Sequence, residues 1–177
     1  MYVAAHIVSI LLTGVMAAQD FRSRSISVWL LPVICVSLTV TQWVQSDWSV
    51  IGYNAAVNMI LLLGLYIAMT IWFSLKARSW VRLDDVYIGR GDLLLLLLLA
   101  PVFAPFNYLL FFISGSAAAL VVYGILNLFR PDAKRLIPLA GMLGITLVLF
   151  CLYELISDGS FRLSSDFLNM ILNNYLY

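Results

Sequence analysis

Two acidic residues stand at the edges of apolar stretches, where a carboxylate could do chemistry. Asp92 closes the segment Gly89-Arg90-Gly91-Asp92 and heads the leucine run Leu93–Leu99. At the head of an apolar helix, such a charge lies at a water–lipid boundary and is costly to desolvate. Asp92 could instead cap its own helix, because free backbone N–H groups at a helix N-terminus donate to carboxylates. Gly89 and Gly91 let the backbone turn sharply and let another segment approach the carboxylate.

The composition places the chain among integral membrane proteins. Hydrophobic residues make up 63% of the 177 residues, charged residues make up 11%, and the mean hydropathy is +1.01. These values exclude an ordinary soluble domain. Each crossing of a hydrocarbon core of roughly 30 Å takes about 20 mostly apolar residues, so the chain has room for about six crossings. We therefore expect an all-α polytopic membrane protein with about six transmembrane helices in a compact bundle.

Six apolar stretches are the expected spans. They run over about 2–18, 26–44, 48–75, from 92 onward, 108–129 and 136–155. The fourth is short, because Pro101 and Pro105 interrupt it. We expect residues 1–156 to form the transmembrane domain. Residues 157–177 form a C-terminal tail, part of which is expected to be an amphipathic helix on the membrane surface.

The basic residues predict the orientation. Nine of the ten Lys and Arg residues fall between spans one and two, three and four, or five and six, and Arg162 in the tail is the exception. The positive-inside rule places those three loops in the cytoplasm and both termini outside. Asp20, at the end of the first span, and Asp92, at the start of the fourth, then lie at one depth on the cytoplasmic side.

Two carboxylates at one depth suggest acid–base chemistry if the bundle brings them together. Facing carboxylates cannot both ionise easily, so they share a proton. One can act as a base on water while the other acts as an acid on a peptide carbonyl, as in an aspartic protease. Asp20 could instead form an interfacial salt bridge with Arg22 or Arg24.

No metal or redox site is predicted. Cys35 and Cys151 lie in apolar stretches and form no C-x-x-C pair, and His6 has no Cys, His or carboxylate at ligand spacing. We expect no cofactor and no nucleic-acid partner. The lipid bilayer is an expected partner, and the sequence leaves the oligomeric state open.

The motifs around both acids resemble those of the type IV prepilin peptidases. Asp20-Phe21-Arg22-Ser23-Arg24-Ser25-Ile26 is similar to their first active-site motif. Gly89-Arg90-Gly91-Asp92 matches the second, the G-x-G-D signature that presenilin-type proteases and archaeal preflagellin peptidases share in related form. Ile137-Pro138-Leu139-Ala140 opens the sixth span, where the family tends to have a Pro-containing apolar motif. The resemblance covers essentially the whole chain in motif order, loop placement and orientation.

The chain also departs from the family pattern. Ser27-Val28 stands where members commonly have Pro-Asn, and Leu94 stands where many have a Lys. Larger relatives carry a cytoplasmic domain with paired C-x-x-C motifs and an N-methyltransferase activity. This chain looks like a peptidase-only form, because it has two isolated cysteines and no room for that domain.

The resemblance implies an aspartic endopeptidase of the bacterial inner membrane, with Asp20 and Asp92 as its catalytic pair. Its substrate would be a prepilin or pseudopilin, whose short basic leader precedes a membrane helix. Cleavage would follow a glycine at the cytoplasmic boundary. Gly89 and Gly91 would let the substrate backbone approach. Asp84 and Asp85 would attract the basic leader, unless they are simply a solvated acidic loop.

Two other classes of function stay open. Acids at a helix boundary and a discontinuous fourth span also suit a proton- or cation-coupled transporter. Against a transporter, both acids lie on one side of the membrane and no inverted repeat is evident. The third class is a noncatalytic membrane subunit of a pilus or secretion assembly.

Overall fold

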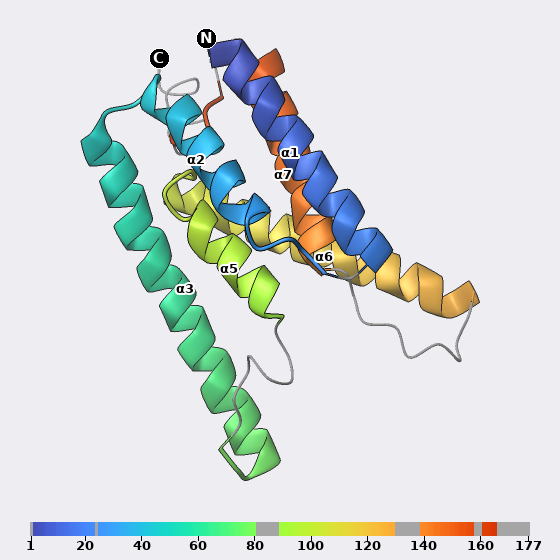
Figure 1. The fold of residues 1–177 in the computed structure, drawn as a ribbon. Coiled ribbons are helices and arrows are strands. Elements are labelled where there is room, and N and C mark those ends of the chain that lie inside the picture. The colour runs from blue at the N-terminus through green and yellow to red at the C-terminus, as the bar shows by residue number, and fades with distance from the viewer. Residues whose placement is uncertain (1, 24, 81–88, 130–138, 158–160, 166–177) are drawn as a thin grey trace, which may run out of the picture.

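The chain is built from helices. A computed structural model describes residues 2–23, 25–80, 89–129, 139–157 and 161–165, and all regular structure in these ranges is α-helical. The helices are α1 (Tyr2–Ser23), α2 (Leu30–Trp43), α3 (Trp48–Ala77), α5 (Arg90–Leu99), α6 (Pro105–Phe129) and α7 (Leu139–Ile156) (Figure 1). The all-α prediction is confirmed. Of the C-terminal tail, where part was expected to form a helix, residues 161–165 are described and are not helical, and residues 158–160 and 166–177 lie outside the described residues.

In the part of the chain that the structure describes, four helices are long enough to span a membrane, and the prediction of six spans stays a prediction. Within the described ranges, α1, α3, α6 and α7 are long and apolar enough to cross a bilayer, which supports the membrane class. At 1.5 Å per residue, α2 reaches about 21 Å and α5 about 15 Å. The α2 helix begins at Leu30, so Pro32 lies in its first turn, where a missing N–H costs no helical hydrogen bond. The α5 helix ends before Pro101.

The α1 and α7 helices pack most extensively against each other. Their contact depends on glycines of α7. A Cβ atom at Gly144 would lie 2.9 Å from Met16 Cε and 3.1 Å from Ala17 Cβ, closer than side chains normally pack. On the other side of α7, a Cβ atom at Gly115 of α6 would lie 2.6 Å from Leu143 Cδ2. Small residues thus let three apolar helices approach closely, as is common in membrane bundles.

A turn over residues 100–104 lies inside the bundle, between α5 and α6. Its polar backbone groups must bind protein partners, because apolar surroundings offer them no water. Asn58 of α3 donates to Ala100 O at 2.8 Å and to Phe103 O at 2.7 Å. Ala104 N donates to Leu163 O at 2.7 Å. The turn is therefore held by segments that are distant in sequence.

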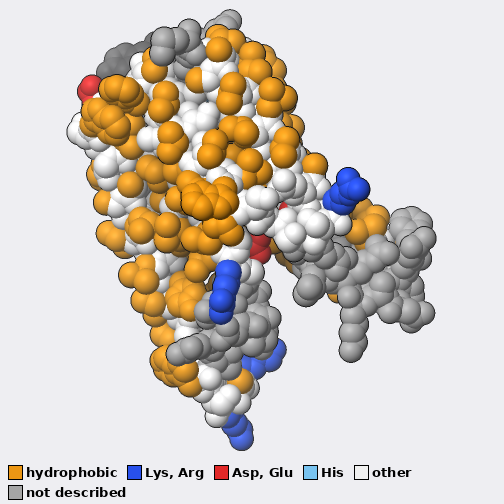
Figure 2. Space-filling model, viewed as in Figure 1, with side chains coloured by type: hydrophobic (Ala, Val, Ile, Leu, Met, Phe, Trp, Pro, Cys, Tyr) orange, Lys and Arg blue, Asp and Glu red, His pale blue; other side chains and the backbone are white. Residues whose placement is uncertain are grey.

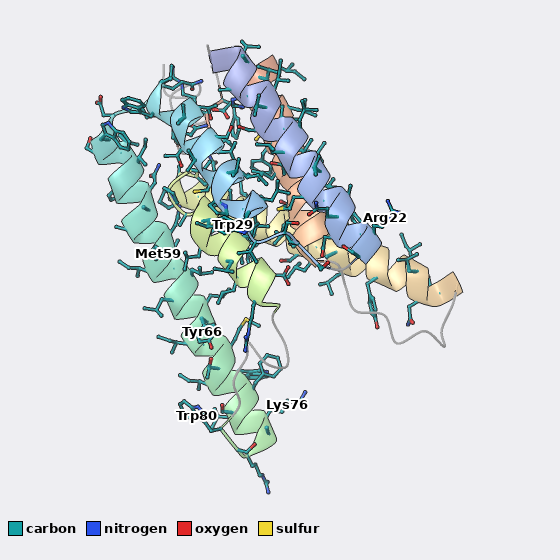
Figure 3. The ribbon with its side chains drawn as sticks, viewed as in Figure 1. Arg22, Trp29, Met59, Tyr66, Lys76 and Trp80 are labelled. Carbon is teal, nitrogen blue, oxygen red and sulfur yellow. The ribbon has the colours of Figure 1, made fainter. Side chains whose placement is uncertain are left out.

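The bundle opens at the end where α1 finishes and where α5 and α7 begin, which we call the acidic end. There α3 and α6 run apart (Figure 1). No residue from Met59 to Trp80 is buried, and Met59, Tyr66 and Lys76 mark this separated part of α3 (Figure 3). The surface between the diverging parts is hollowed, and acidic side chains are visible there (Figure 2). We call the opposite end, where α1 begins and α7 ends, the distal end.

We expect Gly144→Leu to destabilise the bundle by about 1–3 kcal/mol, because a larger side chain overpacks the α1–α7 contact. Gly64→Leu on α3 is the matched control, since a Cβ atom there meets nothing within 4 Å. Unfolding in detergent, followed by circular dichroism, measures both. Equal losses of stability in the two variants would contradict the proposed packing.

Candidate active site

Asp20 is buried near the end of α1 and binds the start of α7. Its side chain is 7% exposed, and its Oδ2 accepts a hydrogen bond from the backbone N–H of Gly141 at 2.6 Å. A Cβ atom at position 141 would lie 3.0 Å from this oxygen and 3.1 Å from Phe21 Cε2. Gly141 therefore supplies the donor and also leaves the room that the carboxylate needs.

Asp92 lies in the first turn of α5 and has two backbone partners. The backbone of Gly89, which precedes its own helix, and the backbone of Ala140 in α7 both hydrogen-bond to its carboxylate. The capping interpretation is thus correct, since a third-position carboxylate that binds the N-cap N–H is half of a capping box. It is also incomplete, because Asp92 binds α7 and is subject to the charge of Asp20.

The two carboxylates converge on one helix terminus. Ala140 and Gly141 are consecutive residues in the first turn of α7, and they bind Asp92 and Asp20 respectively. N–H groups in the first turn of a helix have no partners within the helix, and they lie at the positive end of its dipole. This terminus therefore stabilises negative charge on either carboxylate, although the two still repel each other when both are ionised.

The salt bridge considered for Asp20 is not formed with Arg22. Asp20 and Arg22 make no ion pair, and Arg22 is exposed at the end of α1 (Figure 3). Arg24, the other possible partner, lies outside the described residues. The carboxylate of Asp20 is directed into the bundle, toward Gly141.

The two glycines of the G-x-G-D segment differ in their surroundings. A Cβ atom at Gly89 would lie 2.8 Å from Asp92 Oδ2, so the absence of a side chain there leaves the carboxylate open. A Cβ atom at Gly91 would make an ordinary contact of 3.7 Å with Ile26 Cδ1. Asp84 and Asp85, predicted to attract a basic leader, lie outside the described residues.

Sequence reasoning missed Gly141 as a site residue. The Pro-containing motif was noted only as far as Ala140, although Gly141 and Gly144 follow at a spacing that places both on one face of a helix. It also treated His6 as isolated, whereas His6 Nε2 lies 3.2 Å from Glu154 Oε2. In the described part of the chain, no group of three or more His, Cys, Asp or Glu residues could hold a metal ion.

Electrostatic repulsion within the pair makes a prediction about stability and pH. Repulsion exists only when both carboxylates are ionised, so the wild type should lose stability as pH rises. Asp20→Asn keeps an oxygen that can accept from Gly141 but removes one charge. Its stability relative to wild type should rise by on the order of 1 kcal/mol between about pH 5 and about pH 8.

Thermal unfolding in detergent at both pH values measures this difference. Asp47→Asn is the control, because Asp47 is an exposed acid at the start of α3, on the distal end. A pH-dependent gain of the same size in both variants would show that the two carboxylates do not interact.

Comparisons with protein-family models, with curated proteins and with solved structures found no match for this chain.

Proposed function

We propose that this protein is an intramembrane aspartic endopeptidase that removes the leader from type IV prepilin or pseudopilin-like precursors. One observation carries the proposal: Asp20 and Asp92, from remote parts of the chain, bind consecutive residues at the start of α7. This convergence supports the resemblance of both acidic motifs to those of the prepilin peptidases.

In the proposed reaction the two carboxylates act as a pair that holds one proton. The ionised carboxylate takes a proton from water as the water oxygen attacks the scissile carbonyl carbon. The protonated carboxylate gives its proton to the carbonyl oxygen, which forms a gem-diol. As the C–N bond of the gem-diol breaks, the carboxylate that took the water proton gives it to the amide nitrogen, and the other carboxylate takes a proton from a gem-diol hydroxyl, which leaves a carboxylic acid product and the singly protonated pair. We assign the acid and base roles to the pair and not to one residue each, because coupled acids titrate together.

Two features support this chemistry. No side chain at Gly89 covers Asp92 Oδ2, and a Cβ atom there would lie 2.8 Å from it. The surface at the acidic end is hollowed, and acidic side chains are visible in the hollow (Figure 2). In the proposed topology all six apolar segments cross or enter the bacterial inner membrane, the acidic end faces the cytoplasm and both termini lie outside. Asp84 and Asp85 would then lie on the side of the basic leader.

Proton-coupled transport is the second candidate, because α1 has a buried polar face. His6, Ser9, Thr13 and Asp20 are all buried on this helix. The Thr13 hydroxyl donates to Ser9 O of its own helix at 2.7 Å, and apolar Met16 and Ala17 separate Thr13 from Asp20. The polar face is therefore interrupted, which favours the peptidase.

Cleavage of a purified prepilin in proteoliposomes tests the proposal. The wild type should remove the leader, and Asp20→Asn and Asp92→Asn should each lower the rate at least about a thousandfold, because each removes one member of an acid–base pair. Asp47→Asn should cleave as the wild type does. An intact precursor with wild type, as expected of a transporter or a noncatalytic subunit, would refute the peptidase, as would cleavage by either Asn variant at the wild-type rate.

Gly141→Ala should lower the cleavage rate about ten- to a hundredfold. The added methyl group forces Asp20 or Phe21 to move, and small displacements of catalytic groups are costly. Gly124→Ala on α6 is the matched control, because a Cβ atom there meets nothing within 4 Å. Equal rates for the two variants would show that Asp20 does not depend on Gly141.

A further inference from the structure

A second polar cluster is buried at the distal end. Glu154, near the end of α7, is 2% exposed, while His6 of α1 and Gln42 of α2 are fully buried. Gln42 Nε2 donates to both carboxylate oxygens of Glu154, at 3.1 Å and 3.2 Å. His6 Nε2 lies 3.2 Å from Glu154 Oε2. Glu154 therefore joins three helices.

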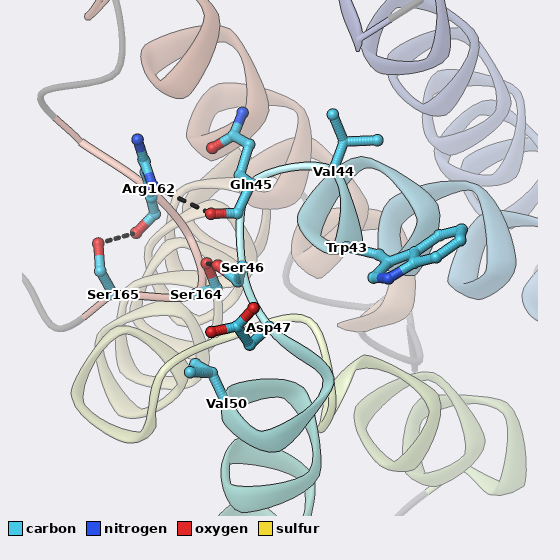
Figure 4. A pocket seen from close by; sticks show the side chains of 9 residues that line it. All are labelled: Trp43, Val44, Gln45, Ser46, Asp47, Val50, Arg162, Ser164 and Ser165. Carbon is cyan, nitrogen blue, oxygen red and sulfur yellow. Dashed lines mark hydrogen bonds between the residues drawn. The ribbon is translucent and has the colours of Figure 1, made fainter.

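Glu154 also holds a segment that returns into the bundle after α7. Leu163 N donates to Glu154 Oε1 at 3.3 Å. Arg162 donates to Gln45 O at 3.1 Å, and the hydroxyls of Ser46 and Ser164 lie 2.8 Å apart, so the segment also binds the turn between α2 and α3 (Figure 4). We call His6, Gln42, Glu154 and residues 161–165 the distal clasp.

The distal clasp is bonded to the turn that follows α5 and to the first turn of α6. Leu163 O accepts from Ala104 N at 2.7 Å and from Asn107 Nδ2 at 3.2 Å. Leu163 belongs to the same buried apolar cluster as Leu99 and Phe103. The turn that ends α5 is thus anchored to Glu154 through one residue, Leu163.

Packing alone does not explain the Glu154 carboxylate. A buried charge costs free energy even when it is paired. Glu154 lies in the last turn of α7, where the helix dipole is negative and disfavours a carboxylate. An apolar residue would fill the same space without this cost. The specific gain from the carboxylate is that it can accept from Gln42 and Leu163 at once.

We propose that the distal clasp is a positioning site for Asp92. It holds the turn that follows α5, and the first turn of the same helix carries Asp92, about 11 Å from Leu99 along the axis. Residues at the far end of the bundle therefore set where the Asp92 carboxylate meets α7. The activity readout below rests on the proposed peptidase function.

A disulfide tests the anchoring without any substrate. Cys35 Sγ of α2 donates to the backbone Leu98 O of α5 at 2.8 Å, so the two helices touch here and we expect the thiol of Leu98→Cys to come within reach of Cys35. Oxidation should form this disulfide readily in the wild-type background. Glu154→Ala should slow its formation about tenfold, because unsatisfied partners of Glu154 loosen the clasp. Glu154→Gln should retain most of the rate, because its amide oxygen can still accept from Leu163.

Prepilin cleavage supplies the second readout. Glu154→Ala should lower kcat about tenfold and leave KM within about twofold, since the clasp positions Asp92 but does not touch substrate. Glu154→Gln should restore most of kcat. Gln45→Ala is the matched control at the same end, because Gln45 Oε1 has no hydrogen-bond partner.

Two outcomes decide the inference. Slower disulfide formation with Glu154→Ala, and rescue by Glu154→Gln, supports it, whereas disulfide and cleavage rates equal to those of Gln45→Ala overturn it. If Glu154→Ala does not fold, His6→Ala removes a single partner and should change both rates in the same direction. If wild type cleaves no precursor, the peptidase proposal fails and the disulfide alone decides on the clasp.

Discussion

The contact between α1 and the first turns of α7 is the constraint on which the rest of the structure depends. Gly141 and Gly144 let α1 approach α7 so closely that Asp20 reaches a backbone N–H group. The same turn of α7 binds Asp92 from α5. A helix terminus with free N–H groups is one of the few places inside an apolar bundle where two carboxylates can be held together. The glycines that let α1 and α7 pack closely are therefore also the reason why the Asp20 carboxylate reaches its backbone donor.

The short α5 helix creates a second requirement. A helix of 10 residues that ends inside the bundle leaves polar backbone groups among apolar side chains. Asn58 donates to Ala100 O and Phe103 O in the turn after α5, and Leu163 O accepts from Ala104 N of the same turn. The acidic end and the distal end are thus linked through α5, since the helix carries Asp92 at one end and its anchors at the other.

The sequence predicted much of this and missed identifiable parts. The apolar stretches gave the helices, because membrane helices must be apolar over their length. The second stretch was predicted to begin too early, since Ile26 to Trp29 precede α2, whereas the fourth ends before Pro101 as its prolines predict. The sequence predicted Asp20 and Asp92 as a pair, because each lies at the end of an apolar span and the predicted topology places both ends on the same side of the membrane. His6 and Glu154 were not paired, since nothing in local spacing connects the two ends of the chain.

The sequence by itself determined the membrane class, the helical segments and the two acidic positions, since each follows from local composition and from which residues interrupt an apolar run. Only the tertiary structure decided that both carboxylates bind the start of α7, that Gly141 makes room for one of them, and that Glu154 binds Gln42 and Leu163. These contacts join residues remote in sequence, so they depend on how closely the helices pack. Packing distance is set by small side chains on both partners at once, and no single stretch of sequence contains that information.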